Sequence, residues 1–127
     1  MKLRIVVADD NTAFLAKIVS GLAAEFEVVA TAADGRSALE CIRLYRPNVV
    51  VLDLEMPGLN GLEVTRGLAE SPSSPAVVIC SVENDPEIVE AARQAGALGY
   101  VFKSRIAQDL IVAVKSAADG QSFLSPS

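Results

Sequence analysis

The chain of 127 residues lacks histidine and tryptophan, and only 5% of its residues are aromatic. Without histidine it cannot carry a phosphohistidine, a histidine-based catalytic triad or a histidine-ligated zinc ion. Its chemistry must therefore use carboxylates, lysine and hydroxyl groups. The few aromatics, set against 51% hydrophobic residues, indicate a core of Val, Ile, Leu and Ala. Such a core is typical of a parallel sheet covered by helices.

Cysteine, positive charge and long apolar runs are also sparse. Cys41 and Cys80 have no CxxC spacing, and we expect both to be buried, reduced thiols. Sixteen acidic and eleven basic residues give a net charge of −5, which opposes direct binding to nucleic acid or to an anionic membrane. The apolar run near the N-terminus is shorter than the roughly 7 to 15 residues of a signal peptide, so we expect a cytoplasmic protein.

The residues that are present form five short β-branched runs that alternate with five helical patterns. We expect strands at residues 3–8, 27–31, 48–53, 76–81 and 99–102. We expect helices starting near Asn11 or Thr12 and over residues 36–45, 61–70, 86–95 and 106–118. This alternation predicts an α/β domain with a parallel sheet, and the length fits one domain.

Four of the five predicted strands end on a group that can take part in phosphoryl chemistry. These groups are Asp9 with Asp10, Asp53, Ser81 and Lys103, whereas the second strand runs into two alanines. In an open parallel sheet the ligand lies beyond the carboxyl ends of the strands. The strand order 2-1-3-4-5 places the second strand at an edge and makes the four reactive ends contiguous. The sequence therefore favours this order, which flavodoxin-like folds share, over 3-2-1-4-5.

Three neighbouring carboxylates repel one another, and a hard cation relieves the repulsion. Mg²⁺ binds oxygen ligands, commonly one or two carboxylates, waters and a phosphoryl oxygen. One aspartate at a strand end would more often cap a helix or lie in solvent. The convergence of Asp9, Asp10 and Asp53 with Ser81 and Lys103 instead predicts a magnesium-dependent site.

Four segments of the chain form a recognisable set: VADDN at 7–11, DLEMPGLNG at 53–61, ICS at 79–81 and GYVFK at 99–103. With these segments the chain resembles the receiver domain of response regulators in two-component signalling. The ending GQSFLSP at 120–126 resembles receivers that precede a LuxR-type helix-turn-helix, as in the NarL/FixJ-like subfamily. The resemblance implies a flavodoxin-like (βα)5 three-layer sandwich. It also implies a receiver domain at 1–120 and, at 121–127, a tail or the start of a linker to an absent output domain.

The resemblance also implies which residues form the phosphorylation site. Asp53 would be the phosphoacceptor, taking a phosphoryl group from a sensor histidine kinase or a small phosphodonor. Asp9, Asp10 and Asp53, with the backbone carbonyl of Glu55, would bind Mg²⁺. The domain would assist its own phosphorylation and dephosphorylation without being an enzyme on other substrates.

A second group of residues would sense the phosphoryl group. Lys103 would contact one of its oxygens, and Ser81 would donate a hydrogen bond to it. Tyr100 would rotate inward when Ser81 moves, which would change the surface of the fourth helix, fifth strand and fifth helix. That change would control phosphorylation-dependent homodimerisation or a transcriptional output domain.

Three other functions compete with this interpretation. A magnesium-dependent phosphatase with an aspartate nucleophile would need a second aspartate two positions after Asp53, where this chain has Glu55. A nucleotide- or flavin-binding domain would need a glycine-rich loop, but no glycine lies between Ala8 and Phe14. A phosphorylation-independent docking module would not need the complete set of reactive side chains.

Overall fold

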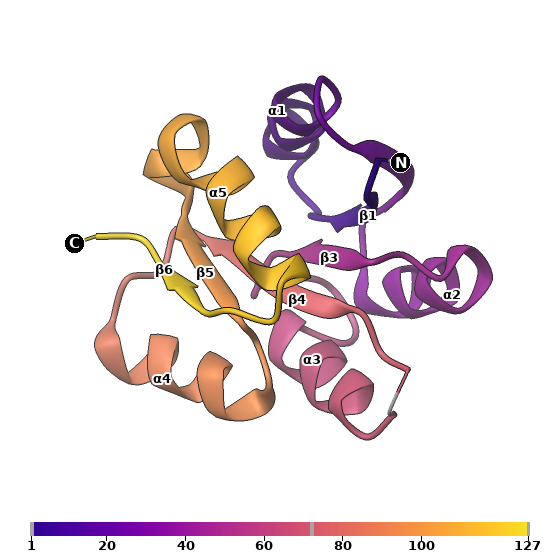
Figure 1. Ribbon diagram of the computed structural model, residues 1–127. Coiled ribbons are helices and arrows are strands. Elements are labelled where there is room, and N and C mark those ends of the chain that lie inside the picture. The colour runs from indigo at the N-terminus through magenta and orange to yellow at the C-terminus, as the bar shows by residue number, and fades with distance from the viewer. Residues whose placement is uncertain (1, 72, 127) are drawn as a thin grey trace.

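A six-stranded parallel sheet lies between two layers of helices in the computed structural model, which describes residues 2–71 and 73–126 (Figure 1). The strands are β1 (Arg4–Ala8), β2 (Glu27–Ala32), β3 (Val49–Leu52), β4 (Ala76–Ser81), β5 (Gly99–Phe102) and β6 (Phe123–Leu124). Their order is β2-β1-β3-β4-β5-β6, and every neighbouring pair is parallel. The predicted order 2-1-3-4-5 is confirmed, with β2 at one edge. Met1 and Ser127, the outer ends of the predicted domain and tail, lie outside the described residues.

Five helices cover the two faces of the sheet. They are α1 (Thr12–Leu22), α2 (Gly35–Tyr45), α3 (Gly61–Ala69), α4 (Pro86–Ala95) and α5 (Ile106–Ala118), the last preceded by the 3-10 turn η1 (Lys103–Arg105). α1 and α5 pack on one face, and α2, α3 and α4 pack on the other. Both faces are therefore buried, which explains why the central strands are apolar throughout rather than alternating.

The strands β1 to β5 each contribute to both layers of the core because successive side chains point to opposite faces. In β1, Ile5 and Val7 join the core under α1 and α5, whereas Val6 and Ala8 join the core under α2, α3 and α4. All four are at most 1% exposed. Because the apolar side chains must stay in the core, each strand is fixed along its own direction. The residues that follow the strand ends are therefore fixed in position as well.

Polar side chains cap four of the helices at their N-termini. Asn11, Asp34, Asn60 and Asp85 each accept a hydrogen bond from a backbone N–H of the first turn. In α3 the side chain of Glu63 also accepts from the backbone of Asn60, which completes a capping box. This box offsets the two glycines that weaken the helical pattern of α3.

The two cysteines have different environments. Cys80 in β4 is fully buried as expected, and burial raises the pKa of its thiol to about 12. Cys41 on α2 is only half-buried, which differs from the expectation, and its thiol lies 3.9 Å from the carbonyl oxygen of Thr31. Neither thiol is in a disulfide.

The sixth strand is a feature that the sequence analysis did not predict. β6 lies within the segment at 121–127 and pairs with β5, so that Phe123 is opposite Gly99 and Leu124 is opposite Tyr100. The N–H of Phe123 donates to the carbonyl of Leu98 at 2.9 Å. A run of two apolar residues carries no strand signal, and the strand exists because the edge of β5 offers it unpaired backbone groups. Among the described residues, no helix has the length and hydrophobicity to cross a membrane.

Candidate functional site

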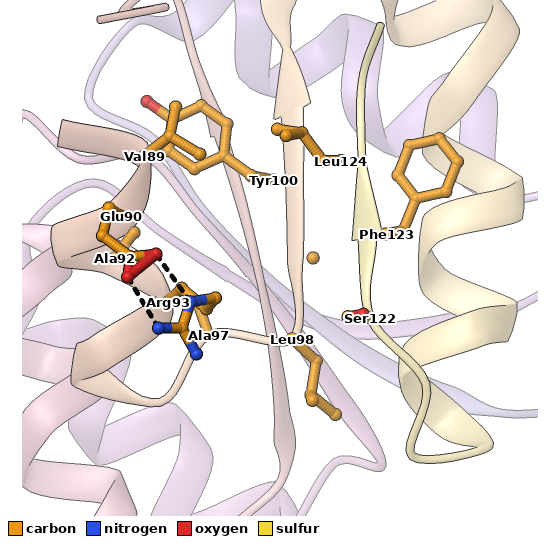
Figure 2. A pocket seen from close by; sticks show the side chains of 11 residues that line it. Val89, Glu90, Ala92, Arg93, Ala97, Leu98, Tyr100, Ser122, Phe123 and Leu124 are labelled. Atoms are coloured by element: carbon orange, nitrogen blue, oxygen red, sulfur yellow. Dashed lines mark hydrogen bonds and ion pairs between the residues drawn. The ribbon is translucent and has the colours of Figure 1, made fainter. Parts of the chain in front are cut away.

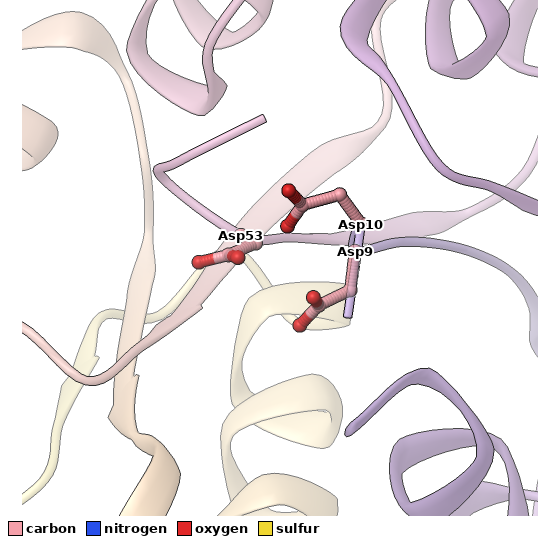
Figure 3. Close-up of side chains that lie close together, drawn as sticks. All are labelled: Asp9, Asp10 and Asp53. Carbon is pink, nitrogen blue, oxygen red and sulfur yellow. The ribbon is translucent and has the colours of Figure 1, made fainter. Parts of the chain in front are cut away.

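Three carboxylates meet where β1 and β3 end. Asp9 and Asp10 follow β1, and Asp53 follows β3, which is the neighbour of β1 in the sheet (Figure 3). The backbone N–H of Asp53 donates to the carbonyl of Ala8 at 2.9 Å, which extends the ladder between these two strands. One carboxylate oxygen from each aspartate lies within 4.8 Å of the others. Asp9 and Asp53 are buried, whereas Asp10 is exposed, so the cluster opens to solvent on the side of Asp10.

Lys103 reaches this cluster from the end of β5. Its ammonium Nζ lies 2.7 Å from Oδ2 of Asp9 and 3.3 Å from Oδ2 of Asp53, and its side chain is 5% exposed. The ring of Phe14 on α1 lies below the ammonium, 4.3 Å from Nζ to the ring centroid. Phe14 is not among the site residues predicted from the sequence. Its contact with Lys103 adds a cation–π interaction that positions the ammonium.

The charges in this cluster shift the pKa of two groups. Burial, followed by the charge of Asp9, raises the pKa of the Asp53 carboxyl, and Lys103 only partly opposes this. For Lys103, burial lowers the pKa, but the close contact with Asp9 and the charges of Asp53 and Asp9 more than offset that effect and raise it. One ammonium among three carboxylates leaves an excess of negative charge.

The cluster fits a hard divalent cation. Oδ2 of Asp9 is buried and accepts no hydrogen bond of good geometry, so its contact with Lys103 is ionic. Lys103 supplies one positive charge to this oxygen, and a divalent cation would offset the negative charge that remains on the three carboxylates. All side-chain ligands available here are carboxylate oxygens, which suit Mg²⁺.

Ser81 and Tyr100 form a second group of polar contacts. The hydroxyl of Ser81, at the end of β4, accepts a hydrogen bond from the N–H of Glu83 at 3.0 Å. The hydroxyl of Tyr100 donates to the carbonyl of Glu83 at 2.7 Å. The Tyr100 ring is 4% exposed and packs edge-on against Phe102, and burial is the main cause that raises its pKa to about 12. Both side chains therefore hold the same loop, and Tyr100 already lies inward.

The loop after β3 is held by two close backbone approaches. Gly58 takes φ 73°, a conformation that glycine adopts without strain. Gly61 begins α3 against the Asp53 peptide, so a Cβ at position 61 would collide with the carbonyl of Asp53. Gly35, at the start of α2, packs against the backbone of Leu59 in the same loop, and a Cβ there would collide with the Leu59 carbonyl. No sequence pattern indicates the contact between Gly35 and Leu59.

Comparison with known proteins identifies the family. Residues 5–115 match the model of the response regulator receiver domain, and the chain belongs to this family. It is 37% identical over 127 residues to the transcriptional regulatory protein DegU of Brevibacillus brevis, covering 98% of this chain and 54% of DegU. It is 34% identical over 128 residues to the probable transcriptional regulatory protein NarL of Mycobacterium tuberculosis, covering 99% of this chain and 59% of that protein.

A solved structure supports the same assignment at the level of the fold. The two-component response regulator of the LuxR family from Aurantimonas sp. SI85-9A1 superposes with a TM-score of 0.92 at 30% identity, over 99% of this chain and 91% of that one. The chain spans a little more than half the length of the curated relatives named above. The predicted family and its LuxR-type relatives are thereby confirmed, and the chain is a signalling domain related to transcriptional regulators.

Proposed function

We propose that Asp53 accepts a phosphoryl group from the phosphohistidine of a sensor kinase or from a small phosphodonor. A carboxylate oxygen of Asp53 attacks phosphorus, the bond from phosphorus to the donor's leaving group breaks, and an acyl phosphate forms on Asp53. When the donor is a phosphohistidine, the leaving group is the imidazole of the kinase histidine, which remains part of the kinase. The observation that carries this proposal is the buried Asp53 carboxylate, which lies beside a buried lysine and an open acidic cluster.

The neighbouring residues have distinct roles in this proposal. Asp9, Asp10 and Asp53, with the backbone carbonyl of Glu55, would hold Mg²⁺, which supplies compensating positive charge for the transferring phosphoryl group. Lys103 stays protonated because its carboxylate neighbours raise its pKa. Its ammonium is thus available to contact a phosphoryl oxygen once Asp53 is modified. Through these groups the domain assists both formation and hydrolysis of its own acyl phosphate.

Ser81 and Tyr100 would convert phosphorylation into a change of surface. The Ser81 hydroxyl would leave the N–H of Glu83 and donate to the phosphoryl group, which alters the loop that Tyr100 also holds. The altered surface of α4, β5 and α5 would then control homodimerisation or an output domain. Because the relatives include transcriptional regulators, we propose a cytoplasmic protein whose output is transcriptional and whose DNA binding lies outside this chain.

Incubation with acetyl phosphate and Mg²⁺ tests this function. We expect intact-mass spectrometry to show one added phosphoryl group in the wild type and none in the Asp53→Ala variant. Light scattering during size-exclusion chromatography would then reveal whether the phosphorylated chain dimerises. Sustained turnover of phosphate esters would instead indicate a phosphatase, and failure of the wild type to take up phosphate would indicate a docking module.

A further inference from the structure

The C-terminal segment, residues 121–126, binds β5 through backbone hydrogen bonds and through the buried hydroxyl of Ser125. Ser125 is 2% exposed although its neighbours Leu124 and Pro126 are exposed. Its backbone N–H donates to the carbonyl of Tyr100 at 2.9 Å, and its hydroxyl accepts from the N–H of Phe102 at 3.1 Å. Ser125 therefore forms hydrogen bonds with the two residues that flank Val101 in β5, Tyr100 and Phe102, and the second of these directly precedes Lys103.

The same hydroxyl is part of a buried ionic network. Ser125 Oγ donates to Oδ2 of Asp109 on α5 at 2.7 Å. Arg105 in η1 donates to the same carboxylate, with Nε 2.7 Å from Oδ2 and Nη2 3.3 Å from Oδ1. The hydrogen bond from Arg105 is the main cause that lowers the pKa of Asp109, so the carboxylate is ionised at neutral pH and requires a donor. Asp109 and Ser125 take no part in the proposed phosphoryl chemistry.

A serine hydroxyl satisfies two groups that the short strand leaves unpaired. β6 ends at Leu124, one residue before Ser125. The Ser125 hydroxyl accepts from Phe102 in place of a ladder carbonyl and donates its own hydrogen to Asp109. An alanine at this position would leave a buried N–H and a buried carboxylate each short of one partner.

The docked segment also lies beside Tyr100. Leu124 and Tyr100 both line a groove of about 220 Å³ between α4 and the edge formed by β5 and β6 (Figure 2). While the segment is docked, Tyr100 points inward onto the Glu83 carbonyl, and Lys103 contacts Asp9 and Asp53. Docking thus accompanies one half of the proposed switch. Tyr100 is in the inward position that the family resemblance associates with the phosphorylated state, whereas Ser81 still accepts from the N–H of Glu83, as expected before a phosphoryl group is present.

We propose that the C-terminal segment is a detachable strand whose docking through Ser125 favours the phosphorylated conformation of the domain. This inference rests on the proposed function. Because such a coupling is reciprocal, phosphorylation of Asp53 tightens the docking of the segment to the same extent. The segment that leads away from the domain then reports directly on the state of Asp53.

Hydrogen–deuterium exchange of the wild-type chain tests the coupling without any mutation. The probe is beryllofluoride with Mg²⁺, which mimics a phosphoryl group on an aspartate and binds at equilibrium. We expect the amides of Phe102, Phe123 and Ser125 to exchange more slowly when the probe is bound. Unchanged or faster exchange at these amides, with the probe shown to be bound, would overturn the inference.

Variants test the reciprocal effect. Ser125→Ala should weaken beryllofluoride binding by about three- to tenfold, a factor at the low end of typical allosteric couplings. Ser122→Ala is the matched control, because Ser122 is an exposed serine in the same segment, and it should bind the probe as the wild type does. Equal affinity in Ser125→Ala and wild type, or tighter binding in Ser125→Ala, would contradict the coupling.

Two further measurements keep the outcomes separable. Circular dichroism establishes that Ser125→Ala is folded. Asp109→Asn preserves the shape of the side chain, and it should also weaken the binding of beryllofluoride. If acetyl phosphate modifies Asp53 normally while the segment shows no response, the inference fails and the proposed function stands. If the wild type binds no beryllofluoride and takes up no phosphate, both fail together.

Discussion

Lys103 is the only cation that the structure places against the buried carboxylates of Asp9 and Asp53 within the described residues. We expect Lys103→Met to lower the free energy of unfolding by about 3–5 kcal/mol in EDTA, because it leaves two buried charges without a partner. Mg²⁺ should restore part of this loss. Urea unfolding with and without Mg²⁺ measures both effects.

Lys115→Met provides the matched control for that experiment. Lys115 forms an exposed ion pair with Glu25 at 2.8 Å, and its loss should change the free energy of unfolding by no more than about 1 kcal/mol. If Lys103→Met costs no more than this control, the buried carboxylates do not depend on the lysine.

The raised pKa of Asp53 makes a prediction about metal binding at low pH. Mg²⁺ binds the ionised carboxylate and competes with the proton, so affinity falls as the pH decreases through the pKa. Because burial and Asp9 raise that pKa, the fall should begin at a higher pH than for an exposed aspartate. Calorimetric titration with Mg²⁺ at a series of acidic pH values measures how the affinity falls. In the Asp53→Asn variant the remaining pH dependence should lie lower, and an identical profile in both proteins would exclude Asp53 as its origin.

Sequence reasoning at the residue scale succeeded where position in a strand determines position in space. Asp9, Asp10, Asp53 and Lys103 follow strand ends, and parallel strands bring those ends to one edge. Phe14 and Ser125 could not be found in this way. Their contacts depend on how a helix and a tail pack against residues far along the chain, which no local pattern encodes.

Among the helices, two glycines with opposite surroundings provide a matched pair. Gly35 packs against the Leu59 carbonyl, so Gly35→Ala must displace α2 or the loop after β3 and should cost stability by about 1–3 kcal/mol. Gly67 lies exposed in α3 with open space around it, so Gly67→Ala should stabilise by about 0.5–1 kcal/mol. Chemical denaturation of both variants tests the pair. Loss of stability in both would mean that α3 has a constraint at residue 67.

Element boundaries were predicted best where sterically special residues mark them. α4 begins at Pro86 after the cap Asp85 and ends at Gly96, whose φ of 117° suits glycine. α2 begins one residue earlier than expected, because Asp34 caps it through the N–H of Ser37. β6 was missed because its pairing partner, and not its own composition, makes it a strand.

For the whole molecule, Mg²⁺ should act as a stabilising ligand of the folded state. At 100 times its Kd, a ligand that binds only the folded chain adds about 2.7 kcal/mol to the free energy of unfolding. Asp10→Ala should remove most of this gain, yet it should leave the metal-free protein as stable as the wild type because Asp10 is exposed. Thermal unfolding with Mg²⁺ or EDTA measures the effect. Glu40→Ala, which removes an exposed acid from α2, should retain the full gain.

The topology of the molecule was predictable from one strand that lacks a reactive end. β2 ends on alanine and lies at the sheet edge, while the strands that end on Asp9, Asp53, Ser81 and Lys103 are contiguous. This inference works because a site must be built from neighbours. The sixth strand gave no comparable clue, since it ends on no reactive group and pairs outside the site.

The short sixth strand also affects how copies of the domain can meet. An uncovered β5 would offer its backbone to any extended chain, which is a common route to aggregation. β6 occupies that edge for only two residues, and Pro126, which follows Ser125, has no N–H to offer a further strand. Continuous growth of the sheet from one molecule to the next is therefore disfavoured on this side. A partner that approaches this side of the sheet would therefore have to contact side chains rather than add a strand.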